Sequence, residues 1–166
     1  MRSLSRLMLV TLAGFAFAAP VAVSGQGDDQ ISPKSVELEH RGKALLAAGK
    51  LEDAEDALET SLAIDPRNRW AFVDLARVAE KQHLFGKAIR MTNKALLQEP
   101  NDPDAIAVQG EAMVEMGAVA RAQANLLKLQ TICGGKACPQ AAQLAAAISR
   151  GPTVASANTP ASPKSN

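Results

Sequence analysis

Cys133 and Cys138 are the residues whose types and spacing most directly suggest chemistry, and they are the only cysteines in the sequence. They flank the run Gly134-Gly135-Lys136-Ala137. In an oxidising compartment, two cysteines this close together are typical of a disulfide, and the glycines allow the backbone to curl enough to form it. The C-x₄-C spacing differs from the C-x-x-C of thiol oxidoreductases. We therefore expect a structural disulfide, with redox chemistry, metal binding and free thiols as the alternatives.

Metal-binding and catalytic groups are otherwise sparse. A zinc site needs about four ligands, and the only histidines, His40 and His83, lie far from the cysteines in the sequence. The sequence has no G-x-S-x-G, no H-E-x-x-H, no glycine-rich phosphate loop and no tyrosine. An acidic run is better explained as a solvated helix face near a helix N-terminus: Glu52, Asp53, Glu55, Asp56 and Glu59. We expect no enzymatic activity, no metal, no cofactor and no small-molecule substrate.

The charge balance argues against a nucleic-acid partner. The formal net charge is +1, lysine and arginine are interspersed with acidic residues, and aromatic residues make up 3% of the sequence. Nucleic-acid binding needs a concentrated basic surface, and single strands also need aromatic side chains for stacking. A protein or peptide partner fits this composition better.

Residues of the same type recur at a period of 34 along the chain, namely Ala54, Ala88 and Ala122, and also Pro66 and Pro100. A fixed period of about 20–50 residues indicates a structural unit that must stack on copies of itself to bury its apolar face. Each Pro would end a helix, because it lacks the N–H group and pushes the preceding residue out of the helical conformation. Aligned on this period, three units cover residues 35–68, 69–102 and 103–137.

Small residues also recur in the eighth column of the aligned units, at Gly42, Ala76 and Gly110. With the alanine and proline columns, this pattern resembles the tetratricopeptide repeat family from Ser35 to about Ile132. In that family the small residues lie where the two helices of a repeat cross. The chain departs from the family at Arg41 and Gln109, where leucine is usual, which suggests imperfect packing at the edges of the array.

The resemblance implies an all-α fold, a right-handed α-solenoid of three helix–turn–helix repeats in a domain spanning residues 34–150. The period places the first helix of each repeat at 34–48, 69–82 and 103–116, and the second at 51–64, 85–98 and 119–131. A seventh helix is expected over 139–150, since Leu144 and Ile148 would share one face. Terminal repeats of a solenoid need such a cap.

The N-terminal residues 1–24 have the layout of a secretory signal peptide, with Arg2 and Arg6 before an apolar run and cleavage expected after Ala18 or Ser24. The run from residue 7 to residue 19 is shorter than the roughly 20 residues that span a bilayer. A retained membrane anchor is the alternative. We expect residues 25–33 to form a linker, residues 151–166 to form a disordered tail, and the mature protein to be soluble, periplasmic and not membrane-spanning.

In the resembling family, the first helices line a concave face that binds peptides. The corresponding columns give a candidate groove with a basic middle and an acidic third repeat, which would suit a peptide with both charges and apolar anchors. Trp70 is either an anchor for a partner or packs against Pro66. The candidate groove residues are Lys43, Trp70, Val73, Arg77, Lys81, Glu111 and Val114.

Some family members bind the terminal carboxylate of a chaperone tail through a basic clamp. The matching positions of this sequence are mostly acidic and would repel such a tail: Glu39, Lys43, Asp74, Asp104 and Val108.

We therefore expect a protein-interaction module or adaptor of the cell envelope that binds a peptide or helix in the groove. The alternative is a structural or assembly factor that works through its convex surface or through self-association. The second helix of the second repeat offers either an outer basic patch or an ordinary solvated face, at Lys87, Arg90 and Lys94.

Overall fold

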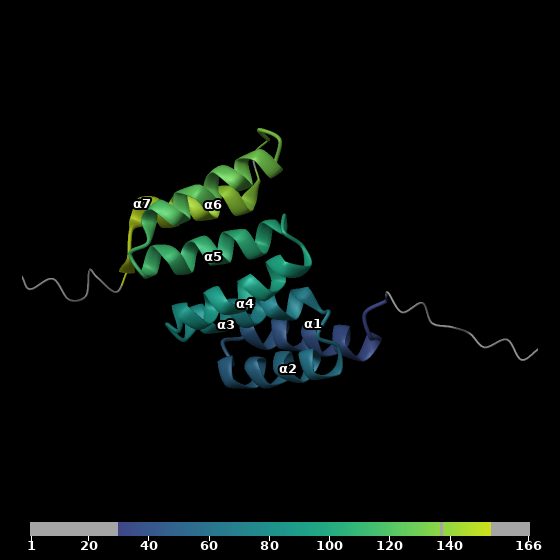
Figure 1. Cartoon of the computed structure of the whole chain (residues 1–166). Coiled ribbons are helices and arrows are strands. Elements are labelled where there is room, and N and C mark those ends of the chain that lie inside the picture. Colours follow the sequence, from purple (N-terminus) through teal and green to yellow (C-terminus); the bar gives the residue numbers. More distant parts are fainter. Residues whose placement is uncertain (1–29, 137, 154–166) are drawn as a thin grey trace, which may run out of the picture. The chain divides into compact units, whose positions relative to one another are not determined.

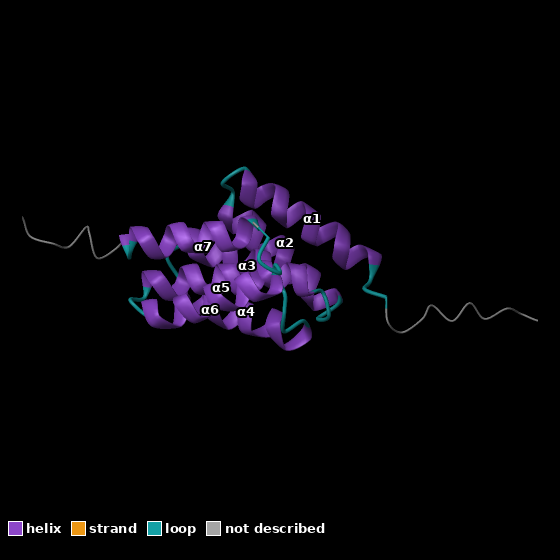
Figure 2. Cartoon of the chain, turned by 90° about the horizontal axis from the view of Figure 1, so that it is seen from above, coloured by secondary structure: helices purple, strands orange, loops and turns teal. Residues whose placement is uncertain are grey.

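The computed structural model describes residues 30–136 and 138–153. The predicted signal peptide and most of the predicted linker and tail lie outside these residues. Within the described part, the chain forms seven α-helices and no strands (Figures 1 and 2). They are α1 Pro33–Ala47, α2 Leu51–Ile64, α3 Arg69–Lys81, α4 Phe85–Gln98, α5 Pro103–Glu115, α6 Val119–Ile132 and α7 Pro139–Arg150.

Each helix begins and ends within one residue of the position that the period predicts. The repeat-closing prolines act as expected. α2 ends at Ile64 and α4 at Gln98, and the residue after each, Asp65 and Glu99, is extended because Pro66 or Pro100 follows. Among the described residues, no helix combines the length and the apolar character that a bilayer crossing requires.

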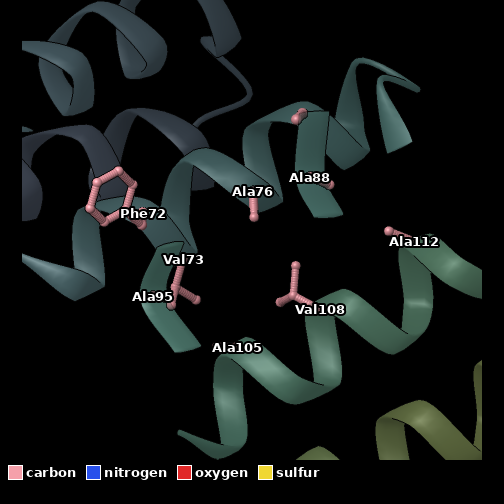
Figure 3. Close-up of a cluster of buried hydrophobic side chains, with 9 residues drawn as sticks. Phe72, Val73, Ala76, Ala88, Ala95, Ala105, Val108 and Ala112 are labelled. Atoms are coloured by element: carbon pink, nitrogen blue, oxygen red, sulfur yellow. The ribbon is translucent and has the colours of Figure 1, made fainter. Parts of the chain in front are cut away.

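The helices pack in two layers. Each helix contacts the next one along the chain, and the first helices also pack on one another, α1 on α3, α3 on α5 and α5 on the cap helix α7. Three apolar clusters fill the layers, and the middle one joins α3, α4 and α5 around Phe72, Val73 and Val108 (Figure 3). Many of the buried residues are alanines. Such small side chains allow neighbouring helix backbones to approach closely, and this makes the packing sensitive to added volume.

Two glycines of the eighth column mark the closest approaches. A Cβ atom added at Gly42 would lie 2.5 Å from Cγ of Leu58, across the crossing of α1 and α2 as predicted. One added at Gly110 would lie 2.6 Å from Cδ1 of Leu144. Leu144 belongs to the cap helix α7, so at this position the small residue serves the contact between α5 and the cap. The small residue of the eighth column therefore faces the second helix of its own repeat at Gly42 and the cap helix at Gly110.

The departure from the family pattern at Gln109 has a local explanation that differs from the imperfect packing expected. Gln109 is buried, and its Nε2 donates to Oδ1 of Asn93 in α4 at 2.7 Å. Its Oε1 accepts from Nδ2 of Asn125 in α6 at 3.1 Å. The amide thus joins the second and third repeats through satisfied hydrogen bonds, as a buried polar group requires.

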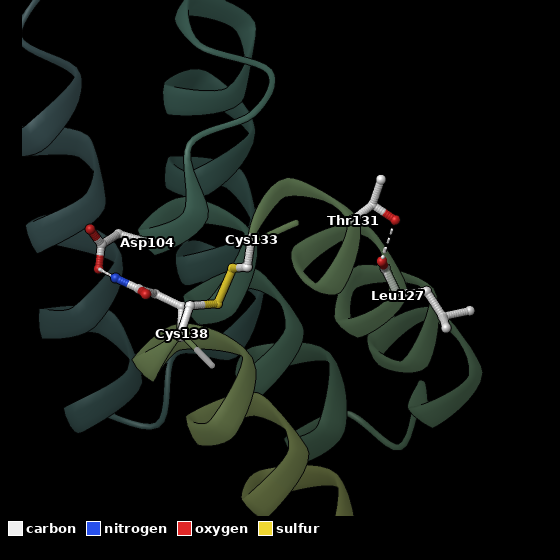
Figure 4. The surroundings of a disulfide bond; sticks show 6 residues. Asp104, Leu127, Thr131, Cys133 and Cys138 are labelled. Atoms are coloured by element: carbon white, nitrogen blue, oxygen red, sulfur yellow. Dashed lines mark hydrogen bonds between the residues drawn. A yellow bond between two sulfur atoms is a disulfide. The ribbon is translucent and has the colours of Figure 1, made fainter. Parts of the chain in front are cut away.

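The third repeat ends differently from the first two. After α6, Gly134 and Gly135 adopt φ angles of 61° and 73°, a left-handed conformation that glycine tolerates. A disulfide joins Cys133 to Cys138 across this turn (Figure 4). α7 then begins at Pro139, and its Leu144 is buried in the cluster shared with α5 and α6. The disulfide therefore fixes the turn that leads into the cap helix.

The close approach at Gly42 makes a prediction about stability. Gly42→Ala gains roughly 1 kcal/mol of helix propensity, but forcing a methyl group against Leu58 costs about 1–3 kcal/mol. We expect a net loss in the free energy of unfolding, measured by urea denaturation. Gly86→Ala is the matched control, because the nearest atom to its added Cβ would be an arginine nitrogen 3.7 Å away. It should be neutral or stabilising. Equal effects at both positions would contradict the packing described.

Candidate binding groove

An open cavity of about 860 Å³ lies along the first helices of the repeats and the cap helix. We call it the inner groove. Its walls come from α1, α3, α5 and α7, with the first residues of α2 and α4, the turns after α1 and α3 and the segment after α7. All three repeats and the cap therefore contribute to it. Its lining includes Leu46, Arg77, Glu80, Lys81, His83, Phe85, Val108, Glu111, Glu115, Gln143, Ala147, Arg150 and Thr153.

The structure brings only part of the predicted groove together. Arg77, Lys81 and Glu111 line the inner groove. Lys43 is exposed but does not line it. Trp70 is 46% exposed at the start of α3, where the Arg69 guanidinium carbon lies 4.2 Å from the centre of its ring. Trp70 also lies outside the lining, so it could contact only a partner that extends beyond the inner groove.

The predictions for Val73 and Val114 are wrong, because both side chains belong to the core. They are 2% and 1% exposed. Val73 is in the cluster with Val108 of α5, and Val114 is in the cluster with Leu144 of α7. Successive first helices pack so closely that columns expected to face a partner face the next helix instead.

Of the predicted basic middle of the groove, Arg77 is neutralised within the protein, whereas Lys43 and Lys81 are exposed. Arg77 is half-buried, and its guanidinium donates to Oδ1 of Asp74 and to Oδ1 of Asp104, each at 2.8 Å. The first contact lies within α3 and the second reaches α5. Asp104 also accepts from Nε2 of Gln140 in α7 at 3.4 Å. Arg77 therefore ties the two middle helices together and offers little charge to a ligand.

The clamp positions of the family hold an internal carboxyl pair here. Glu39 and Asp74 are both buried at the contact between α1 and α3. Burial, together with a hydrogen bond to Asp74 and repulsion by it, raises the pKa of Glu39. His40 and Lys43 oppose that shift. These positions are acidic and largely internal, which agrees with the expected lack of a chaperone-tail clamp.

Three further carboxyl groups line the inner groove, those of Glu80, Glu111 and Glu115. Burial raises the pKa of Glu80 to about 8, aided by repulsion from Glu111 and Glu115. Burial also raises the pKa of Glu111, although a hydrogen bond with Gln143 opposes the shift. Within the described residues, Oε1 of Glu111 is buried without a hydrogen-bond partner. In the described part of the chain, Glu111 thus has one carboxyl oxygen without a partner, while Arg77, Lys81 and Arg150 lower its pKa without cancelling the effect of burial.

The turn after α3 contains His83, where the preceding and following repeats have glycine at the same column. His83 has a φ of 59°, whereas Gly49 and Gly117, one period before and after it, have φ of 74° and 75°. A left-handed conformation is costly for a residue with a Cβ atom. The His83 ring lines the inner groove and meets Phe85 edge-on at 5.9 Å between centroids. A residue that keeps an unfavourable backbone conformation beside a groove is a candidate for function.

We predict that His83→Gly raises the free energy of unfolding by roughly 1 kcal/mol, because glycine relieves the left-handed conformation. Thermal or urea denaturation of the two proteins measures this. Gly117→Ala, which introduces a Cβ atom at the matching turn, should change stability in the opposite direction. A destabilised His83→Gly variant would mean that the contact with Phe85 outweighs the backbone cost.

The outer surface differs from the predicted basic patch. Lys87 forms an ion pair with Glu55 of α2, and Gln82 donates to the same carboxylate at 2.8 Å. Nζ of Lys94 lies 5.3 Å from the centre of the Phe72 ring, and Arg90 is exposed. These lysines are thus engaged with neighbouring helices, and the second helix of this repeat offers mainly Arg90 as a free outer cation.

The helix order and the inner groove define a class, that of helical-repeat solenoids with a peptide-sized groove along their first helices. A family model described as tetratricopeptide repeat matches residues 45–111. Residues 45–111 therefore match the tetratricopeptide repeat family, and the fold of the described residues is that of tetratricopeptide repeat domains. None of the curated protein sequences matches this chain.

Solved structures of tetratricopeptide repeat domains share this fold. The Sgt2 domain from Aspergillus fumigatus superposes with a TM-score of 0.65 at 21% identity, over 81% of this chain and 88% of that one. The TPR2B domain of yeast Sti1, in a complex with a pHsp70 peptide, gives 0.65 at 23% identity, over 72% and 98%. The second such domain of human RPAP3, bound to the HSP70 peptide SGPTIEEVD, gives 0.62 at 21% identity, over 70% and 95%.

Proposed function

We propose that this protein is a non-enzymatic interaction module of the cell envelope that holds a peptide or helix of a partner protein in the inner groove. The observation that carries the proposal is the groove itself, an open cavity of about 860 Å³ to which every repeat and the cap helix contribute. Its lining combines apolar side chains, such as Leu46 and Phe85, with charged ones. A segment with apolar anchors and polar contacts is the ligand that such a lining suits.

Peptide binding by similar folds supports the proposal. The human RPAP3 and yeast Sti1 domains were solved with chaperone peptides. This chain differs at the clamp positions, where Glu39, Asp74 and Asp104 are acidic. A partner other than a chaperone tail is therefore proposed.

The envelope location is supported by two independent features. The first residues have the layout of a signal peptide. A disulfide at Cys133 and Cys138 would persist in an oxidising compartment such as the periplasm. Loss of residues 1–18 or 1–24 from the exported chain, measured by mass spectrometry, is the expected processing.

A second mode of action is favoured by the outer helices. Leu97 of α4 and Leu127 of α6 are 84% and 65% exposed. Exposed leucines on neighbouring second helices could contact a partner or another copy of the chain, as a structural or assembly factor would. The experiment for the proposed function must therefore separate the inner from the outer surface.

Photocrosslinking in the periplasm makes that separation. A photoreactive amino acid at Lys81, an exposed residue lining the groove, should form adducts with the partner. Arg90 reports on the outer surface, and Glu52 on α2 is an exposed control. Arg77 is unsuitable, since its replacement would break two ion pairs. Adducts from position 90 alone would contradict binding in the groove, and adducts between two copies of the chain would favour self-association.

A further inference from the structure

We propose that the inner groove selects partner segments carrying a basic side chain, whose cationic group binds between Glu80 of α3 and Glu111 of α5. The inference rests on the proposed function and adds the chemistry of the ligand. It reverses the carboxylate preference that a basic clamp would give.

The inner groove contains a carboxyl oxygen that lacks a hydrogen-bond partner among the residues that the structure describes. Oε1 of Glu111 is buried and, within the described residues, has no hydrogen-bond partner. Glu80 lies close enough to Glu111 for the two to repel. Removing a carboxylate from water without a partner is costly. An ammonium or guanidinium group would donate hydrogen bonds to both carboxylates and cancel their repulsion.

The protein's own cations do not fill that role. Arg77 is held by Asp74 and Asp104 at 2.8 Å each. Lys81 and Arg150 are exposed side chains of the groove, where solvent screens their charge. Glu115, in contrast, already accepts two hydrogen bonds from Thr153, from its backbone N–H and its hydroxyl, each at 2.8 Å. Glu111, whose Oε1 is unpartnered in the described part of the chain, and Glu80 are therefore the carboxyl groups of the groove left to receive a cation from a ligand.

The apolar walls of the groove suit the stem of such a side chain. Leu46 and Phe85, both half-buried, line the same cavity as the two carboxyl groups. Lysine and arginine bury their methylene groups along apolar surfaces while the charged end reaches polar partners. A carboxylate ligand cannot donate hydrogen bonds to these two carboxyl groups and would be repelled by either of them in its ionised form, since like charges at an interface are unfavourable.

The pKa of Glu80 gives the proposal a pH dependence. Because this pKa is raised to about 8, the carboxyl group of the free protein is largely protonated at neutral pH. A bound cation favours the ionised form, so binding displaces the proton. Affinity should increase as the pH rises through about 8. The charged groups that influence the pair are Glu115, Arg77, Lys81 and Arg150, with His83 also lining the groove.

Selection from a phage-displayed library of random peptides tests the inference on the full mature protein. We expect enriched peptides to share a lysine or arginine at one fixed position. Glu80→Gln and Glu111→Gln should each lower the affinity for a selected synthetic peptide by about tenfold or more. Both changes keep the side-chain shape and remove repulsion, so the melting temperature at neutral pH should not fall. Glu52→Gln, an exposed carboxylate on α2, is the matched control and should leave affinity unchanged.

Four outcomes would overturn the inference. They are enrichment of acidic or uncharged peptides, equal binding of the basic peptide by the Gln variants, an affinity that does not rise with pH in the wild type, and a selection that yields no peptide. Enriched acidic peptides that still compete with adduct formation at position 81 would leave the proposed function standing. Absence of those adducts with the natural partner would instead count against the proposed function itself.

Discussion

The packing of each repeat's first helix against the next is the constraint on which the rest of the structure depends. Gly110 of α5 leaves no room for a Cβ atom without a shift of Leu144 in α7, just as Gly42 leaves none beside Leu58 within the first repeat. The packing of α3 with α5 buries Val73, and the packing of α5 with α7 buries Val114. This packing also aligns α1, α3, α5 and α7 along a single groove. Small residues at a fixed period thus determine both the stability of the array and the surface it can offer.

The same packing sets the electrostatics of the groove. Side chains from adjacent first helices are brought within interaction distance, so acidic residues that are far apart in the sequence become neighbours. Asp74 and Asp104 share Arg77 between them. Glu80 and Glu111 lie on the same two helices, and the nearby cations, Arg77 and Lys81 for both with Arg150 for Glu111, only partly offset the burial that raises the pKa of each carboxyl group. The inner groove therefore carries both signs of charge, and its acidic side chains come from the second repeat as well as from the third.

The sequence predicted the helices well, because a period of 34 residues and two prolines determine where each helix ends. It predicted much less of the groove. A column gives the position of a residue along its helix, but burial depends on how near the following helix comes, and this is why Val73 and Val114 were misplaced. Aligning the repeats in columns also does not show which side chains pair between helices, such as Arg77 of α3 with Asp104 of α5. The left-handed His83 could have been found, because glycine occupies the same column in the flanking repeats.

The central claim is that the partner occupies the inner groove. NMR chemical-shift mapping of the labelled mature protein, titrated with the partner captured by crosslinking, tests it most directly. We predict that the largest shifts occur at Glu80, His83, Glu111 and Arg150. Shifts confined to the surroundings of Leu97 and Leu127, with the groove resonances unchanged, would contradict the account and assign binding to the outer helices.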